Sequence, residues 1–336
     1  MGGLAGERGE RDGACGLTRR HGVRALAPVE RNSRRPTGLD PGMTQHRSVA
    51  KVVPATRTVE GGGFVVRRTF PGPRLDMVDP FLLLDHMGPA DYAPGEAVGA
   101  PDHPHRGFET VTYMLEGAFE HHDSSGGGGY LGPGDVQWMT AGAGIVHSEL
   151  PAERIRREGG RIQGLQLWVN LPRADKMSPP RYQEIKSDEI PVTEPVPGAR
   201  VKVVAGDVFG ERGPVETHSP IVYLHVTLQP GASLDVPIPS GHQAFAYVIH
   251  GRGQFGNEDT VASESQLVLF AGDDGDVHVE GPDDLEGPID VLVVSGVPLR
   301  EPVARYGPFV MNTRDELVQA FDDYQSGAMG RIAATS

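Results

Sequence analysis

The 336-residue sequence has little cysteine, no long hydrophobic run and a shortage of positive charge. Cys15 is the only cysteine, so no disulfide can form within the chain, and we expect a reducing, cytoplasmic compartment. No stretch approaches the roughly 18 consecutive apolar residues that predict a transmembrane helix, and we recognise no secretory leader. The formal net charge of −14 disfavours direct binding to nucleic acid or to an anionic membrane.

Glycine and proline are abundant instead, with 46 and 29 residues. Both residues interrupt regular elements, so their number predicts many turns between short strands rather than long helices. Between these turns lie short runs of β-branched and aromatic residues, such as Phe64–Phe70 and Ile221–Val226. We therefore predict an all-β fold, with one short helix near the C-terminus.

A capping box and an apolar stripe predict that helix. Thr313 and Glu316 stand three residues apart, which is the spacing of an N-cap and the residue that bonds back to it. Four apolar residues then follow at helical spacing and share one face. They are Leu317, Ala320, Phe321 and Tyr324. We expect this face to pack against the β-fold.

Residues 1–42 differ in composition from the rest of the chain. They contain eight arginines, no lysine and five acidic residues among many glycines, with few large apolar side chains. Such a segment cannot bury a core, so we expect a disordered extension. We also expect Met43 to be the working initiator.

An internal repeat predicts two units in the remainder. A shift of 134 residues superposes Glu109–Leu115 on Gln243–Ile249, and each unit contains strand, glycine turn, strand, glycine-rich loop and strand. The proline-rich stretch at 171–180 is typical of a connection between domains. We therefore expect an N-terminal domain at 43–176 and a C-terminal domain at 177–336.

Two pairs of metal-capable side chains bracket the glycine-rich turn of the first unit. His103 and His105 stand two residues apart, as do His147 and Glu149. Residues i and i+2 of a strand point to the same face, so each pair directs two ligands to one side. Three imidazoles and a carboxylate suit a divalent ion such as iron, copper, nickel, manganese or zinc. Unlike the thiolate set of structural zinc, they leave positions open for water, substrate or dioxygen.

The carboxylate ligand has two candidates at this point. Glu109 shares the strand parity of His103 and His105, so strand geometry permits Glu109 as well as Glu149. Spacing alone does not choose between them.

Other polar and aromatic residues lie near these motifs. His121 belongs either in the same cavity or on a solvated edge, and His122 should face the opposite side of the strand. We expect Trp138 and Trp168 in the core. Strand parity nevertheless lets some aromatic residues line the interior, where an aromatic ligand could stack.

The second unit carries a similar pair without the rest of the site. His278 and Glu280 have the same spacing as the second pair of the first unit. The 134-residue shift, however, places Pro237 and Pro239 where the first unit has its first two histidines. We expect an exposed strand pair, and a second domain that lacks metal ligands.

Six segments of the chain form a recognisable pattern. They are Asp79–Asp85, His103–Val111, Pro133–Gly142, Gly144–Glu149, Gly164–Leu171 and Gly307–Thr313. With them the chain resembles the pirin family of the cupin superfamily, from about Ser48 to about Tyr324. The resemblance implies a bicupin, which consists of two tandem antiparallel cupin β-barrels face to face.

The resemblance also implies one iron, expected as Fe(2+), in the first barrel. By position its ligands would be His103, His105, His147 and Glu149, and the second barrel would have none. Glu109 would then orient a ligand imidazole from behind.

Several pirins open a flavonol ring with dioxygen, as quercetin 2,3-dioxygenases do, so the resemblance implies a flavonol-like aromatic substrate. Glu149 is then our candidate base for the proton of the flavonol 3-hydroxyl. An alternative is an iron-dependent, redox-sensing regulatory protein that acts through protein partners, as an animal member of the family does. A third, weaker alternative is a protein that stores or buffers metal.

Overall fold

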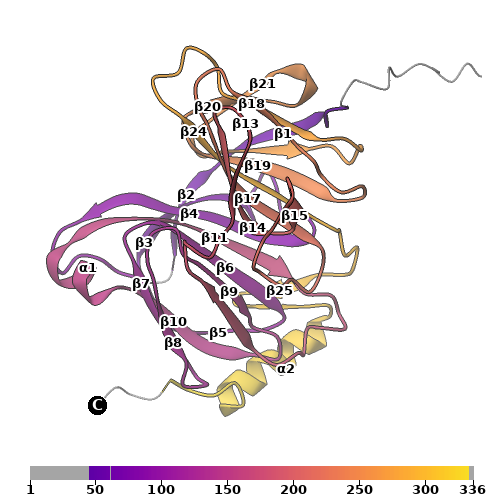
Figure 1. Ribbon diagram of the computed structural model, residues 1–336. Helices are drawn as coiled ribbons and strands as arrows, with labels where there is room; N and C mark the ends of the chain where they lie inside the picture. The colour runs from indigo at the N-terminus through magenta and orange to yellow at the C-terminus, as the bar shows by residue number, and fades with distance from the viewer. Residues whose placement is uncertain (1–44, 61, 333–336) are drawn as a thin grey trace, which may run out of the picture. The chain divides into compact units, whose positions relative to one another are not determined.

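The computed structural model describes residues 45–60 and 62–332, in which antiparallel strands dominate (Figure 1). The predicted all-β class with a helix near the C-terminus is confirmed. The described residues also contain a short helix, α1 (Glu153–Glu158), and a 3-10 turn, η1 (Gly256–Glu258). In this part of the chain no helix is long and apolar enough to cross a membrane. The predictions for residues 1–42 fall outside the described residues.

Two antiparallel sheets form what we call the first half. The large sheet has the spatial order β12 (Arg181–Ile185), β9 (Val136–Thr140), β6 (Phe108–Glu116), β11 (Gly160–Asn170), β4 (Phe81–Tyr92), β3 (Phe64–Phe70) and β2 (Thr56–Glu60). The small sheet has the order β5 (Ala100–His105), β10 (Ile145–Pro151), β7 (Phe119–Asp123) and β8 (Gly128–Leu131).

Two further sheets form the second half in the same arrangement. Its large sheet has the order β1 (Val49–Pro54), β22 (Gln266–Phe270), β19 (Gln243–His250), β24 (Ile289–Gly296), β17 (Ile221–Leu228), β14 (Ala199–Ala205) and β13 (Val192–Val196). Its small sheet has the order β18 (Ser233–Val236), β23 (Val277–Glu280), β20 (Arg252–Phe255) and β21 (Thr260–Ser263). Two short hairpins complete the strands, β15 (Asp207–Val208) with β16 (Glu211–Arg212) and β25 (Ala304–Tyr306) with β26 (Phe309–Met311).

The strand order confirms the predicted repeat. β6 and β19, which the 134-residue shift superposes, hold the third position in their large sheets, between equivalent neighbours. The edge strands are exchanged between the halves. β1 precedes the first half in the chain but pairs with β22, and Figure 1 shows it, in indigo, among the orange strands. β12 follows the first half's other strands and pairs with β9. Strand pairing therefore crosses the division predicted at residue 176, which stays a prediction.

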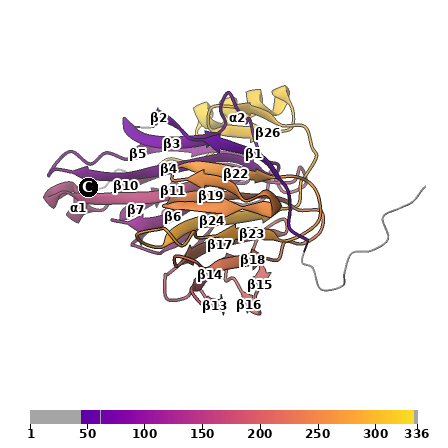
Figure 2. The same ribbon diagram turned by 90° about the horizontal axis from the view of Figure 1, so that it is seen from above.

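The main apolar core lies between the two large sheets, which pack face to face (Figure 2). Its largest side chains include Phe81, Tyr113, Trp138, Tyr223, Phe245 and Tyr247. Burial of each contributes about 1.5–3 kcal/mol. Hydrogen bonds cross the same interface, where the Tyr247 hydroxyl lies 2.9 Å from His86 Nδ1 and the Tyr113 hydroxyl lies 2.8 Å from His225 Nδ1.

The interiors of the two halves differ in polarity. In the second half, aliphatic side chains fill the space between the large and small sheets, among them Leu234, Val236, Val277 and Val279. In the first half, the corresponding space holds buried polar groups, among them Thr112, Gln137, His147 and Glu149. Because buried polar groups require partners, the first half is the place to look for a site.

The C-terminal helix α2 (Arg314–Ser326) begins at the predicted capping box. Thr313 Oγ1 accepts a hydrogen bond from the Glu316 backbone at 3.3 Å, and the Glu316 carboxylate accepts one from the Thr313 backbone at 2.8 Å. Leu317, Ala320 and Phe321 pack in one cluster with Phe309 and Val146. The fourth predicted residue, Tyr324, is exposed, with its ring centroid 6.4 Å from that of Phe309. The helix therefore covers the outer face of the first half's small sheet.

Lys176 joins, by hydrogen bonds, three segments that meet at the end of the first half's small sheet. Its buried amine donates to the carbonyl oxygens of Gly107 at 2.8 Å, Val310 at 3.0 Å and the Asn170 side chain at 2.7 Å. These segments are the turn after β5, strand β26 and the end of β11.

The substitution Lys176→Met should destabilise the fold. It leaves buried acceptors without a donor, and each such group costs about 1–3 kcal/mol. We expect the free energy of unfolding, measured by urea denaturation, to fall by about 2 kcal/mol or more. The exposed Lys51→Met is the control and should change it by less than about 0.5 kcal/mol. Equal free energies of unfolding for the two variants would contradict a stabilising role for the hydrogen bonds of Lys176.

Candidate metal centre

Strands β5 and β10 bring the predicted histidines together. They pair antiparallel with His147 directly opposite His103, and His105 lies two residues further along β5. Opposite residues of a strand pair share a face, so the three side chains point to the same side of the small sheet. A bulge after His147 then leaves Ser148 without a partner on β5.

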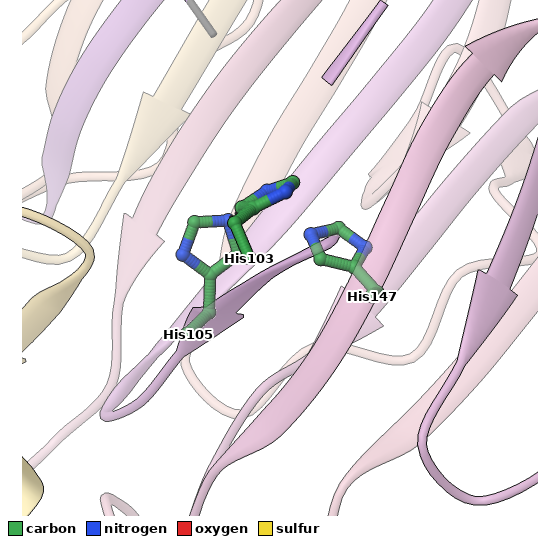
Figure 3. Close-up of side chains that lie close together, drawn as sticks. All are labelled: His103, His105 and His147. Carbon is green, nitrogen blue, oxygen red and sulfur yellow. Dashed lines mark hydrogen bonds between the residues drawn. The ribbon is translucent and has the colours of Figure 1, made fainter. Parts of the chain in front are cut away.

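The three imidazoles converge on one point (Figure 3). One ring nitrogen from each of His103, His105 and His147 lies within 4.8 Å of the others. The Nε2 atoms of His103 and His105 are 3.1 Å apart, and the ring centroids of His103 and His147 are 4.4 Å apart. His105 and His147 are buried.

Backbone carbonyls fix which nitrogens face inward. His103 Nδ1 lies 2.7 Å from the Pro101 carbonyl, and His105 Nδ1 lies 3.3 Å from the Pro308 carbonyl. A carbonyl oxygen can only accept, so each Nδ1 carries the proton and each Nε2 presents a lone pair. Two lone pairs 3.1 Å apart repel each other unless a cation lies between them.

His147 gives independent evidence of a missing partner. The residue is fully buried, and neither of its ring nitrogens has a hydrogen-bond partner in the described residues. A buried polar group in that state costs about 1–3 kcal/mol. A metal ion would satisfy one of these two nitrogens, so the residues present fit the metal that the sequence predicted.

Burial favours the neutral, metal-binding form of two of the imidazoles, His105 and His147. Burial lowers the pKa of His105 well below its usual value, and the neighbouring His103 and His147 lower it further. Burial also lowers the pKa of His147, with His103 as the next cause. A neutral ring keeps the lone pair that coordination needs.

Glu149 lies beside the imidazoles and is anchored by two donors. The Thr112 hydroxyl donates to one carboxylate oxygen at 2.8 Å, and the Gln166 amide donates to the other at 3.0 Å. Both donors belong to the large sheet, so Glu149 spans the interior. The group of atoms within 4.8 Å of one another does not include Glu149, and its role as a fourth ligand stays a prediction.

Glu109 does not approach the site, because the strand parity used in the sequence argument is broken. Gly107 adopts a left-handed φ of 86°, and the chain enters β6 with Phe108 turned toward His105 instead. Glu109 accepts from the Thr140 hydroxyl at 2.7 Å and lies 3.0 Å from His218 Nδ1. The expectation that Glu109 orients a ligand imidazole is therefore wrong.

His121 lies inside the first half rather than on a solvated edge. It stands opposite Glu149 on the neighbouring strand β7, and it is buried. Its ring stacks on Tyr182 with centroids 5.2 Å apart, and its Nε2 contacts the Glu184 carboxylate. The prediction that His122 faces outward is confirmed, since that side chain is exposed.

A cavity of about 590 Å³ opens beside the imidazoles. His103, His105 and Glu149 form part of its wall, and Trp168 forms another, with its ring centroid 5.2 Å from that of His105. The rest of the wall combines apolar side chains, among them Phe64, Leu83 and Met87, with charged ones, among them Arg68, Asp85 and Arg305. Trp138, by contrast, is buried in the core between the large sheets. The volume falls within the range of about 300–1,000 Å³ that is usual for small-molecule sites.

Two family models match most of the described chain. The model described as Pirin matches residues 63–169, and the model described as Pirin C-terminal cupin domain matches residues 223–330.

Individual relatives match at nearly full length. A pirin-like protein of Solanum lycopersicum is 45% identical over 284 residues, which are 84% of this chain and 93% of that protein. A pirin-like protein of Caulobacter vibrioides is 44% identical over 283 residues, which are 84% of this chain and 98% of that protein. A crystal structure of quercetin 2,3-dioxygenase from Acinetobacter baumannii superposes with a TM-score of 0.80 at 35% identity, and it covers 86% of this chain and 100% of that one.

Removal of one imidazole should weaken metal binding. We expect His147→Ala to lower the affinity of the tightest metal equivalent by more than about 100-fold, since even a partner that only orients a ligand is worth about 10–100-fold. The affinity can be measured by competition with a chromogenic chelator, on protein without a histidine tag. His122→Ala, an exposed histidine of the same small sheet, should leave the affinity unchanged. An unchanged affinity in His147→Ala would place the metal elsewhere.

Proposed function

The chain belongs to the pirin family, and on that premise we propose that it is a metal-dependent dioxygenase that opens the ring of a flavonol-like aromatic substrate. The observation that carries the proposal is the pair of Nε2 lone pairs of His103 and His105, 3.1 Å apart beside a cavity of about 590 Å³. The similarity to the Acinetobacter baumannii quercetin 2,3-dioxygenase, at 35% identity, supports the substrate class.

His103, His105 and His147 would hold the metal, proposed to be Fe(2+), with Glu149 as the proposed fourth ligand. When bound, the metal would acidify a substrate hydroxyl and supply the redox chemistry with dioxygen. Three imidazoles and one carboxylate leave coordination positions free for both reactants.

The cavity wall suits a flat aromatic substrate. Trp168 offers a ring beside His105, and an aromatic substrate gains both apolar burial and stacking there. Leu83, Met87 and Phe119 line the same wall and keep water from the reacting end. These residues position the substrate and contribute no charge.

Glu149 is the proposed base for the substrate hydroxyl. Its carboxylate lines the cavity, and the donors Thr112 and Gln166 fix its orientation from the large sheet. Each oxygen retains a lone pair that those two bonds do not use, so the carboxylate can accept the proton. A base held in place in this way needs no rearrangement before proton transfer.

The substitution Glu149→Gln tests this role. We expect quercetin turnover by the iron-loaded protein under air to fall by about 10²–10⁴-fold, the usual contribution of a positioned base. The three imidazoles remain, so most of the bound iron should be retained. Glu109→Gln, an equally buried glutamate that bonds on the other face of the large sheet, should retain turnover. If Glu149→Gln turns over normally, Glu149 is not the base.

One contact favours the alternative of a redox-sensing regulatory protein. Arg106 follows the ligand His105, and its guanidinium forms an ion pair of 2.8 Å with Asp323 of α2. A change at the metal could therefore reach an external helix through one side chain. On this alternative, hydrogen exchange of the α2 amides should differ between the ferrous and ferric proteins, whereas identical exchange would count against it.

A further inference from the structure

A second group of metal-capable side chains lies on the second half, away from the candidate centre. His46, Asp235 and His278 each offer one ligand atom, and these atoms lie within 4.8 Å of one another. His278 Nδ1 is 2.6 Å from Asp235 Oδ1, and His46 Nε2 is 3.0 Å from the same oxygen. The two imidazoles stack with centroids 4.5 Å apart and planes at 17°.

This group has the register of the first centre but the opposite face. In the second half β18 pairs with β23, and Asp235 stands opposite His278, as His103 stands opposite His147 in the first half. The residues on either side of this pair, including Val236 and Val277, fill the interior. Successive residues of a strand point to opposite faces, so Asp235 and His278 point outward.

The third member is held in place by its backbone. The Arg47 amide donates to the Asp276 carbonyl at 2.8 Å, and the Asp276 amide donates to the Gln45 carbonyl at 2.9 Å. His46 belongs to the segment that leads into β1. The two bonds flank His46 and hold it beside β23. The three ligand atoms therefore come from three segments whose positions the sheet already determines.

The surroundings favour a cation. Glu280 lies 3.9 Å from His278 Nε2, and Asp276 adds a second carboxyl group nearby. The guanidinium of Arg47 is directed elsewhere, since it donates to the carbonyls of Gly275 and His242.

We propose that His46, Asp235 and His278 bind a divalent cation of the zinc class. Two imidazoles and one carboxylate are a usual set of three protein ligands for zinc, with water in the fourth position. The partial exposure of all three side chains leaves a path for the ion and its water. The ion would join the segment before β1 to the small sheet of the second half, so its effect is on stability. The proposal does not depend on the dioxygenase activity.

Zinc titration of the full-length chain, made without a histidine tag, tests the proposal. We expect two equivalents in the unsubstituted chain and one in His147→Ala, because the second site survives loss of the first. Adding Asp235→Asn or His278→Ala to His147→Ala should remove the remaining equivalent and its rise in Tm. Cobalt in place of zinc should give the visible absorption of a tetrahedral ion, and the same two substitutions should abolish that absorption.

The matched control is His250→Ala in the same background. His250 also lies beside a carboxylate of the second half, 3.3 Å from Glu264, but belongs to no group of three ligands among the described residues. It should leave the remaining zinc equivalent and its affinity unchanged. A single equivalent in the unsubstituted chain that Asp235→Asn leaves unchanged would overturn the proposal. So would an equivalent that remains when Asp235→Asn or His278→Ala is added to His147→Ala. If His147→Ala does not fold, Asp235→Asn in the unsubstituted chain should lower the number of equivalents from two to one, and an unchanged number would overturn the proposal.

Discussion

The antiparallel pairing of β5 with β10 is the constraint on which the candidate metal centre depends. Its register sets His103 opposite His147, and the carbonyls of Pro101 and Pro308 turn two of the rings so that their lone pairs face each other. The surrounding structure supports this pair, since Lys176 fastens the turn after β5 and β7 holds the other edge of β10. The second half repeats the pairing but turns valines inward. The two halves share this strand pairing but turn different faces of it to the interior. One face gives a polar site, and the other gives an apolar core.

Features that depend on short stretches of sequence could be predicted. The all-β class follows from frequent glycine and proline, and the start of α2 follows from the spacing of Thr313 and Glu316. The convergence of the three imidazoles follows from two i, i+2 pairs. Parity failed at Gly107, where a left-handed residue between two strands reverses the face on which later side chains lie. For that reason the sequence argument placed Glu109 on the wrong face of its strand.

Features that depend on distant pairing could not be predicted. β1 and β22 are separated by more than half of the chain, and no local periodicity records that they pair. The cluster of His46, Asp235 and His278 has the same origin, because each residue comes from a different segment and only the assembled sheet brings them together. The His-x-Glu pair of the second half was expected to be a plain exposed pair. Its histidine instead bonds across the strand to Asp235, a contact that spacing within one strand does not indicate.

The exchange of β1 also has a consequence for the order of synthesis. A ribosome makes β1 before any strand of the first half, yet its partner β22 emerges more than two hundred residues later. Until then β1 has no neighbour in its own sheet, and β22 later presents an open edge until β1 arrives. The second half therefore cannot close from its own contiguous segment. This pairing joins the first strand of the described residues to one made more than two hundred residues later.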